Sequence, residues 1–300
     1  MLSKIYNLLE FSYENNNTDK IPDIKFQLFL ITVKSLLPYE DNIGCMFDKS
    51  RYEKEIELFS LYKNGNDDSI EYYLENKKLS EDEDKLLEYK ILPIIISNTI
   101  WENLIKEVMK AVTFYSINKR TILNAILLSS VIYEYFDNDS FDYENISKKT
   151  KDRLIQFSIK EFFENNNIEF KKNHYIEFER ERIKILSKSD LFTDDNINKY
   201  KSLIHIFKNE EKTKIEEKTK ETIEQENSIL SNYASYLLKL RKGTINPEKL
   251  KINQGKIPDL KEFLKSSVFS HPLLGKCKVV KRTEKEVILR NKSGLMKVKI

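Results

Sequence analysis

Glycine and proline are scarce in this chain, and that scarcity narrows the possible folds more than any other feature. Only 6 Gly and 6 Pro occur among the 300 residues. Turn-rich β-sandwiches, glycine-rich phosphate loops and doubly wound nucleotide folds need more of both residues. Long helices need few of either, so the sequence favours a mainly helical protein.

The most apolar part of the chain, residues 92–136, is expected to form the core. The polar stretch "INKR" near its middle interrupts the helical apolar period, which predicts an antiparallel pair of helices. The second helix of the pair, "TILNAILLSSVIYEYF", is apolar on nearly all sides. It is therefore expected to lie at the centre of the protein.

Amphipathic helices are predicted around this core. Residues 3–14 and 24–37 carry apolar residues at three-and-four spacing, and a proline is expected to end the second helix. The following stretch, "YEDNIGCMFD", has the composition of a loop. Helices are then predicted over residues 50–65, which end on a glycine, and over the shorter stretches 67–78 and 79–91.

The C-terminal end changes from helical to strand periodicity. From Lys276 onward, apolar and basic residues alternate in "KCKVVKR", "EVILRN" and "LMKVKI", and Gly294 suits a tight turn between the last two strands. A helix is expected just before, over residues 259–269. The predicted fold is mainly α, a multi-helix orthogonal or antiparallel bundle with a small C-terminal three-stranded antiparallel β-meander.

Charge divides the chain unevenly. Three regions are predicted: a helical core domain (1–170), a charged helical segment (171–242), and a linker, short helix and basic meander (243–300). The last region has 14 Lys and Arg against 5 Asp and Glu. Because the whole chain carries +3, residues 1–242 carry −6. Attraction to polyanions is therefore expected at the C-terminus.

Cysteine usage and hydropathy bear on the compartment. Cys45 and Cys277 lie far apart and match no metal-ligand or redox spacing, which predicts free thiols in the reducing cytoplasm. The N-terminus lacks the apolar core of a signal peptide, and the longest apolar run, "ILPIIIS", is too short to span a bilayer. A cytoplasmic protein without membrane contact is expected.

The sequence contains none of the common catalytic or nucleotide-binding motifs: Walker, GxGxxG and HExxH patterns are all absent. Asp23, Asp67 and Asp68 stand where helices are predicted to begin, which favours N-capping. The alternative is that these three carboxylates ligate a hard cation such as Mg²⁺. No cofactor is expected otherwise.

The three histidines are scattered along the chain. His205 is flanked by apolar residues and is expected to be buried, and His174 is expected in a polar loop. His271 precedes a proline, so it is interpreted as a turn residue that caps the preceding helix.

The basic meander supplies a second group of candidate binding residues. Its cations could contact nucleic acid or another polyanion, although it has no Phe, Tyr or Trp to stack on bases. The candidate polyanion-binding residues are Lys276, Lys278, Lys281, Arg282, Arg290, Lys292, Lys297 and Lys299.

Three successive segments resemble a known family. In order, "KFQLFLITVKSLL", "EIELFSLYKNGNDDSIEYYL" and the apolar core resemble the middle of the ADP-ribosylglycohydrolase family, over residues 23–137 or so. Pro93 with Ile94 resembles the family's proline segment, and Thr113 matches the threonine of a Thr-His pair. The resemblance implies a compact all-helical fold with a pair of magnesium ions between helices.

Departures from the family pattern determine the functional expectation. "PDIKF" offers the single Asp23, and Lys25 where a metal-bound hydroxyl is expected, and "TDDN" at 193–196 lacks the Gly and Thr of the second acidic motif. The resemblance thus implies a pseudoenzyme, a cytoplasmic non-catalytic protein that binds a protein partner or an anionic ligand. The alternatives are a divergent magnesium-dependent ADP-ribosylglycohydrolase and a nucleic-acid or polyanion binder.

Overall fold

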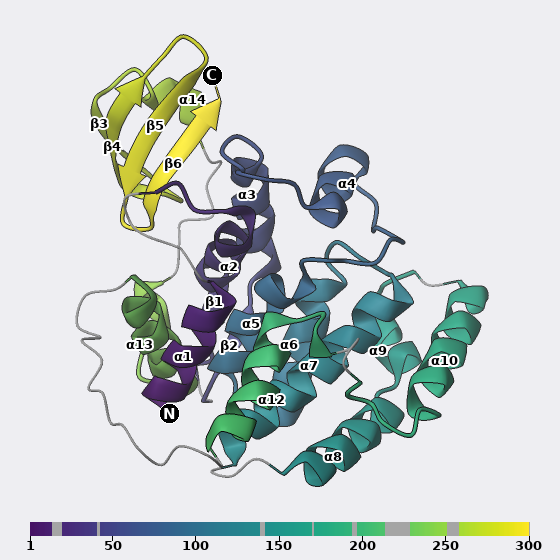
Figure 1. Ribbon diagram of the computed structural model, residues 1–300. Coiled ribbons are helices and arrows are strands. Elements are labelled where there is room, and N and C mark those ends of the chain that lie inside the picture. The colour runs from purple at the N-terminus through teal and green to yellow at the C-terminus, as the bar shows by residue number, and fades with distance from the viewer. Residues whose placement is uncertain are drawn as a thin grey trace.

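The protein is mainly helical and ends in a small antiparallel sheet, which stands beside the helices (Figure 1). The predicted fold class is confirmed in this respect. The computed structural model describes residues 1–13, 20–40, 43–138, 142–169, 171–193, 197–213, 229–250 and 258–299. The helices before the sheet, here called the helical body, are α1 (Leu2–Ser12), α2 (Ile24–Lys34), α3 (Lys49–Phe59), α4 (Asp68–Asn76), α5 (Leu87–Ser97), α6 (Trp101–Val112), α7 (Lys119–Asp137), α8 (Tyr143–Gln156), α9 (Ile159–Asn165), α10 (Lys172–Leu186), α12 (Lys201–Thr213) and α13 (Ile229–Arg241).

Helices α5 and α7 form the centre of the body. Every residue of α5 is buried, and α7 is buried along most of its 19 residues. Helix α5 packs against α2, α6, α7 and α13, so apolar surface is needed on all of its sides. The predicted central position of the second apolar helix, which is α7, is confirmed.

The apolar core holds three helices where two were predicted. The extra break falls after α5, at Asn98, whose Nδ2 donates to Ile94 O at 2.9 Å. Its Oδ1 accepts a hydrogen bond from Cys45 N, 3.1 Å away. Asn98 thus ends α5 and also binds a distant segment, and the apolar period indicates neither of these roles.

A two-stranded hairpin replaces the predicted loop after α2. Helix α2 ends at Lys34 rather than at residue 37, and β1 (Leu36–Pro38) pairs antiparallel with β2 (Cys45–Phe47). The turn between them needs Gly44, which has φ +109°, and a Cβ there would lie 2.5 Å from Asn98 Oδ1. This pairing depends on a contact with α5, so local propensity does not predict it.

The C-terminal sheet has four strands, one more than predicted. Its strands are β3 (Val268–His271), β4 (Gly275–Arg282), β5 (Glu286–Asn291) and β6 (Gly294–Lys299), each antiparallel to the next. The last three strands are those predicted. Strand β3 was missed because residues 259–269 were assigned to one helix, whereas α14 covers only Leu260–Phe263.

The sheet buries one face and joins the body along its last strand. Lys299 N, in β6, donates to Leu61 O just beyond α3 at 3.1 Å, and Tyr233 Oη in α13 donates to Ser293 Oγ at 3.3 Å. In Figure 1 the sheet lies next to α2 and α3. The buried side chains of its inner face are Cys277, Val287, Leu289, Met296 and Val298.

The prediction that His271 caps the preceding helix is wrong, because His271 lies in β3. Its ring is 1% exposed and packs 5.4 Å from the Phe263 ring. Nδ1 accepts a hydrogen bond from Leu273 N at 3.2 Å, so Nε2 carries the proton that faces Pro258 O, 3.4 Å away. A neutral imidazole therefore joins the β3–β4 turn to the segment before α14.

Acidification should destabilise the protein through His271. Burial lowers its pKa, so its contribution to stability is present above the unfolded pKa of about 6.5 and is lost as pH falls through the folded pKa. Urea unfolding at a series of pH values should show this decline. His271→Gln should make it shallower without abolishing it, because burial also lowers the pKa of His205. Equal slopes in variant and wild type would contradict the assignment.

The predicted charged segment forms α10, α12 and α13 within the described residues. Helices α12 and α13 pack against α1, and His205 in α12 is buried as predicted. Most of the charge-rich run at 209–227, and linker residues 251–257, lie outside the described residues. Each helix in the described part of the chain is too short or too polar to cross a membrane.

Candidate functional site

The three predicted metal ligands lie where two helices begin. Asp23 Oδ1 accepts a hydrogen bond from Phe26 N at 2.9 Å, and Asp67 Oδ1 accepts one from Ile70 N at 2.8 Å. The capping roles favoured for these two residues are confirmed. Asp68 is exposed in the first turn of α4. No group of three His, Cys, Asp or Glu side chains in the described ranges could hold a metal ion. The magnesium site stays a prediction.

Replacing Asp23 with Ala should lower the free energy of unfolding by about 1 kcal/mol, because it removes the side-chain acceptor at the start of α2. Denaturant unfolding followed by circular dichroism measures the loss. Asp68→Ala, in an exposed first turn, should lose less than about 0.5 kcal/mol. Both losses should be the same with and without Mg²⁺. A loss at Asp23 that appears only in Mg²⁺ would identify a metal ligand instead.

Asp67 also belongs to a buried ionic cluster. Lys90 Nζ in α5 lies 2.5 Å from Asp67 Oδ2 and 2.9 Å from Asp84 Oδ2. Tyr115 Oη donates to Asp84 Oδ2 at 2.8 Å, and its ring centroid lies 4.4 Å from Lys90 Nζ. The three charged side chains are only 1–2% exposed. We call these four residues the Lys90 cluster.

The Lys90 cluster holds four segments together. Burial lowers the pKa of Lys90, but the two adjacent carboxylates outweigh it and raise that pKa overall. Burial raises the pKa of Asp84. The positive charge of Lys90 acts in the opposite direction but does not cancel this rise. The cluster joins the start of α4, the segment before α5, α5 itself and the α6–α7 connection. Asp84, Lys90 and Tyr115 were not predicted as members of a site. The available signal was a lysine within the apolar run that forms α5.

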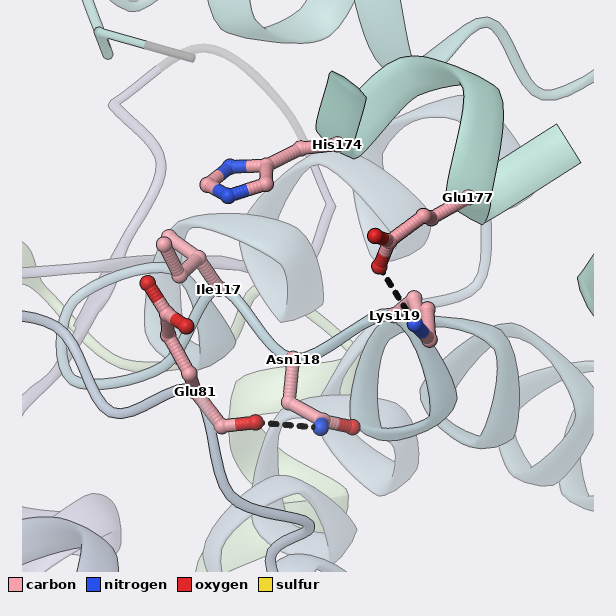
Figure 2. A pocket seen from close by; sticks show the side chains of 6 residues that line it. All are labelled: Glu81, Ile117, Asn118, Lys119, His174 and Glu177. Carbon is pink, nitrogen blue, oxygen red and sulfur yellow. Dashed lines mark hydrogen bonds and ion pairs between the residues drawn. The ribbon is translucent and has the colours of Figure 1, made fainter. Parts of the chain in front are cut away.

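A cleft of about 170 Å³ opens where α10 begins beside the α6–α7 connection. His174 lies within α10, not in a loop as predicted, and Figure 2 shows its ring facing Ile117. Glu177 pairs with Lys119 at 2.5 Å (Figure 2). Glu81 also lines the cleft, whereas Asp23, Asp67 and Asp68 do not. The predicted ligands and the cleft are therefore separate features.

Several cations gather on the exposed side of the C-terminal sheet. Residues directly opposite each other on neighbouring strands share a face. Lys278 faces Arg290, and Arg290 faces Leu295, so these residues lie on the same side. The outer sheet face defined in this way comprises Val268, Ser270, Lys276, Lys278, Lys281, Glu286, Ile288, Arg290, Leu295, Lys297 and Lys299.

A β-bulge brings Lys281 onto this face. Simple alternation along β4 would place Lys281 on the inner side, but the register shifts between Val279 and Lys281. Lys281 therefore stands opposite Ile288, and Val280 is left 52% exposed. Six of the eight predicted cations thus share the outer sheet face.

The other two predicted cations lie elsewhere. Arg282 stands opposite the buried Val287 and donates a hydrogen bond to Leu264 O, on the α14 side of the sheet. Lys292 lies in the turn between β5 and β6. Arg282 therefore has a structural role, and Lys292 extends the basic surface past the strand ends.

One acidic residue moderates the charge of the outer sheet face. Glu286 Oε2 lies 3.5 Å from Lys297 Nζ, and both side chains are 40% exposed. Six cations and one carboxylate leave this face with an excess of five positive charges. Because residues 1–242 carry −6, the two parts of the molecule have opposite electrostatic character.

Comparison with protein-family models, curated proteins and solved structures gives no match to this chain. The resemblance to ADP-ribosylglycohydrolases therefore stays a prediction. Of the residues that suggested it, Pro93 lies inside α5, and Thr113 ends α6 with its hydroxyl bonded to Met109 O at 2.7 Å. Residues 194–196 of "TDDN" lie outside the described residues.

Proposed function

We propose that the chain is a non-catalytic binding protein that contacts an anionic macromolecule through its outer sheet face. The observation that supports this most directly is the excess of five positive charges on one side of a four-stranded sheet. The helical body, in this proposal, is a scaffold related to ADP-ribosylglycohydrolases without their activity. A cytoplasmic location belongs to the same proposal, since both cysteines are free and buried.

The physical basis is long-range attraction followed by contact. Like charges on one surface produce a potential that concentrates and orients an oppositely charged partner. Strands hold the cations at a fixed spacing, so the backbone under them needs no reordering on binding. Self-repulsion among these cations is also relieved by an anionic partner. Binding should accordingly weaken steeply as salt is raised.

Heparin affinity chromatography tests the proposal with the full chain. The protein should be retained at about 50 mM salt and elute as salt rises, because screening removes the attraction. Double-charge reversal by Lys278→Glu and Arg290→Glu should abolish retention. The matched control, Lys106→Glu with Lys148→Glu, changes two exposed lysines of the body and should leave retention in place. Flow-through of the wild type at low salt would end the proposal.

The enzyme alternative has its own assay. Magnesium-dependent release of ADP-ribose from ADP-ribosylated protein, abolished by Asp68→Ala, would replace a binding protein by a divergent hydrolase. Asp68 is the informative position, because its side chain is exposed, whereas Asp67 is held in the Lys90 cluster. A variant at Asp67 would confuse lost activity with lost folding.

Removing the one carboxylate of the outer sheet face should strengthen binding. Glu286→Gln raises the excess charge there by one and releases Lys297 from its ion pair. The affinity for a heparin oligosaccharide should rise about two- to fivefold at low salt, mainly through faster association. Fluorescence anisotropy and stopped-flow mixing measure the two quantities. Unchanged affinity would show that the partner contacts another part of the protein.

A further inference from the structure

We infer that the anionic partner is the phosphate backbone of a nucleic-acid duplex, bound without reading its base sequence. This inference rests on the proposed function and names the partner more closely. Three properties of the outer sheet face support it: which cations it carries, which side chains it lacks, and how the cations are spaced.

The choice of cation favours phosphate over a protein partner. Five of the six cations are lysines, and the sixth is Arg290. Protein interfaces are depleted in lysine and depend on buried Tyr, Trp and Arg anchors. Lysine binds phosphate well as a point charge on a flexible stem. A face dominated by exposed lysines therefore suits a phosphate backbone better than an acidic protein.

The absence of aromatic rings favours a duplex over an unpaired strand. Apart from its charged residues, the outer sheet face carries Val268, Ser270, Ile288 and Leu295. Proteins that hold single strands stack the bases on aromatic side chains, each worth about 1–3 kcal/mol. None of these four residues can stack in that way, so an unpaired strand would gain charge contacts alone. A duplex keeps its own base stacking and presents its phosphates outward.

The cations form two rows that suit two backbones. One row is on β4, with Lys276, Lys278 and Lys281, and the other is on β6, with Lys297 and Lys299. Strand β5 lies between them, so two strand spacings put the rows about 10 Å apart. The grooves of B-DNA are about 6 and 12 Å wide, and flexible lysines can reach the phosphates on both sides. Arg290 lies on β5, opposite Lys278 on β4 and Leu295 on β6.

Sequence independence follows from the same arrangement. Five of the six cations are lysines, which contact phosphates as point charges, and their rows on β4 and β6 would follow the two backbones. Affinity should then follow the number of phosphates neutralised. Engagement of four to six phosphates predicts that log K falls with log salt at a slope of about −4 to −5.

Fluorescence anisotropy of the full chain with labelled oligonucleotides tests the inference. The probes are two unrelated duplexes of about 20 base pairs, one of the corresponding single strands and a heparin oligosaccharide, between about 50 and 200 mM salt. The two duplexes should bind within about twofold of each other, and the single strand at least about fivefold more weakly. Lys278→Gln should reduce the duplex salt slope by about 1, and Lys148→Gln should leave it unchanged.

The outcomes separate this inference from the proposed function. Equal or tighter binding of the single strand, or unequal binding of the two duplexes, overturns the inference while the proposed function stands. Binding of heparin with no binding of nucleic acid also overturns the inference and leaves the proposed function in place. A chain that binds none of the four probes at low salt overturns both.

Discussion

Replacing Lys90 with Met should lower the free energy of unfolding by about 3–5 kcal/mol. Methionine keeps the length and the apolar stem of the side chain, so the packing around α5 is largely retained. What is lost is the ammonium group that Asp67 and Asp84 share at 2.5 and 2.9 Å. The two buried carboxylates then face each other without a counter-ion.

The size of this effect follows from burial. Carboxylates that are at most 2% exposed cannot be solvated in place of the lost partner. They must bind protons or force the site open, and either process favours the unfolded chain. Urea unfolding at neutral pH measures the loss. Lys85→Met is the matched control, because Lys85 is exposed before the same helix and should change stability by less than about 0.5 kcal/mol.

A triple variant separates charge from packing. Lys90→Met combined with Asp67→Asn and Asp84→Asn removes all three charges, so it should be more stable than Lys90→Met alone. Asparagine is nearly as good an N-cap as aspartate, so α4 keeps its start. If Lys90→Met alone lowers the free energy of unfolding by less than about 1 kcal/mol, the Lys90 cluster does not stabilise the packing of these segments.

Neutralising three cations of the outer sheet face should weaken polyanion binding by on the order of a thousandfold. The change is Lys276→Gln with Lys278→Gln and Arg290→Gln, on two adjacent strands. At about 0.1 M salt, each phosphate contact accounts for close to tenfold in affinity through counterion release. Three lost contacts therefore remove most of the binding. Anisotropy titrations with heparin and with duplex measure the change.

A charge-matched control makes the second prediction specific. Lys85→Gln, Lys106→Gln and Lys148→Gln remove the same net charge from exposed positions on the helical body. This control should bind within about twofold of the wild type, since a contact more than a Debye length away is largely screened. Equal losses in both triple variants would mean that net charge, not the outer sheet face, governs binding. The unfolding free energy of both should remain near that of the wild type.

The helical class and several helix starts could be predicted from local sequence. Asp23 and Asp67 illustrate why: a capping residue bonds backbone groups two or three positions later, so its role is complete within one turn. The last three strands were also predictable, because alternating apolar residues must share one buried face. Interactions that close within a few residues leave a local pattern in the sequence.

Contacts between distant segments could not be predicted in this way. Glu88 in α5 accepts a hydrogen bond from Lys201 N at 2.9 Å at the start of α12, and no local pattern relates residues 113 positions apart. Lys90 could be recognised as unusual within an apolar run, but its partners could not be identified. Strand β3 was missed because its identity depends on pairing with β4.

By itself the sequence determined a mainly helical chain, an apolar centre at α7 and a concentration of positive charge at the C-terminus. Composition, periodicity and net charge are summed along the chain and need no knowledge of contacts. Tertiary structure alone decided that Asp67, Asp84 and Lys90 form one cluster, and that a bulge turns Lys281 toward the other cations. The cluster depends on segments that meet only when the chain folds, and the position of Lys281 depends on strand register. In both cases the stabilising contacts form between residues that are distant in the sequence.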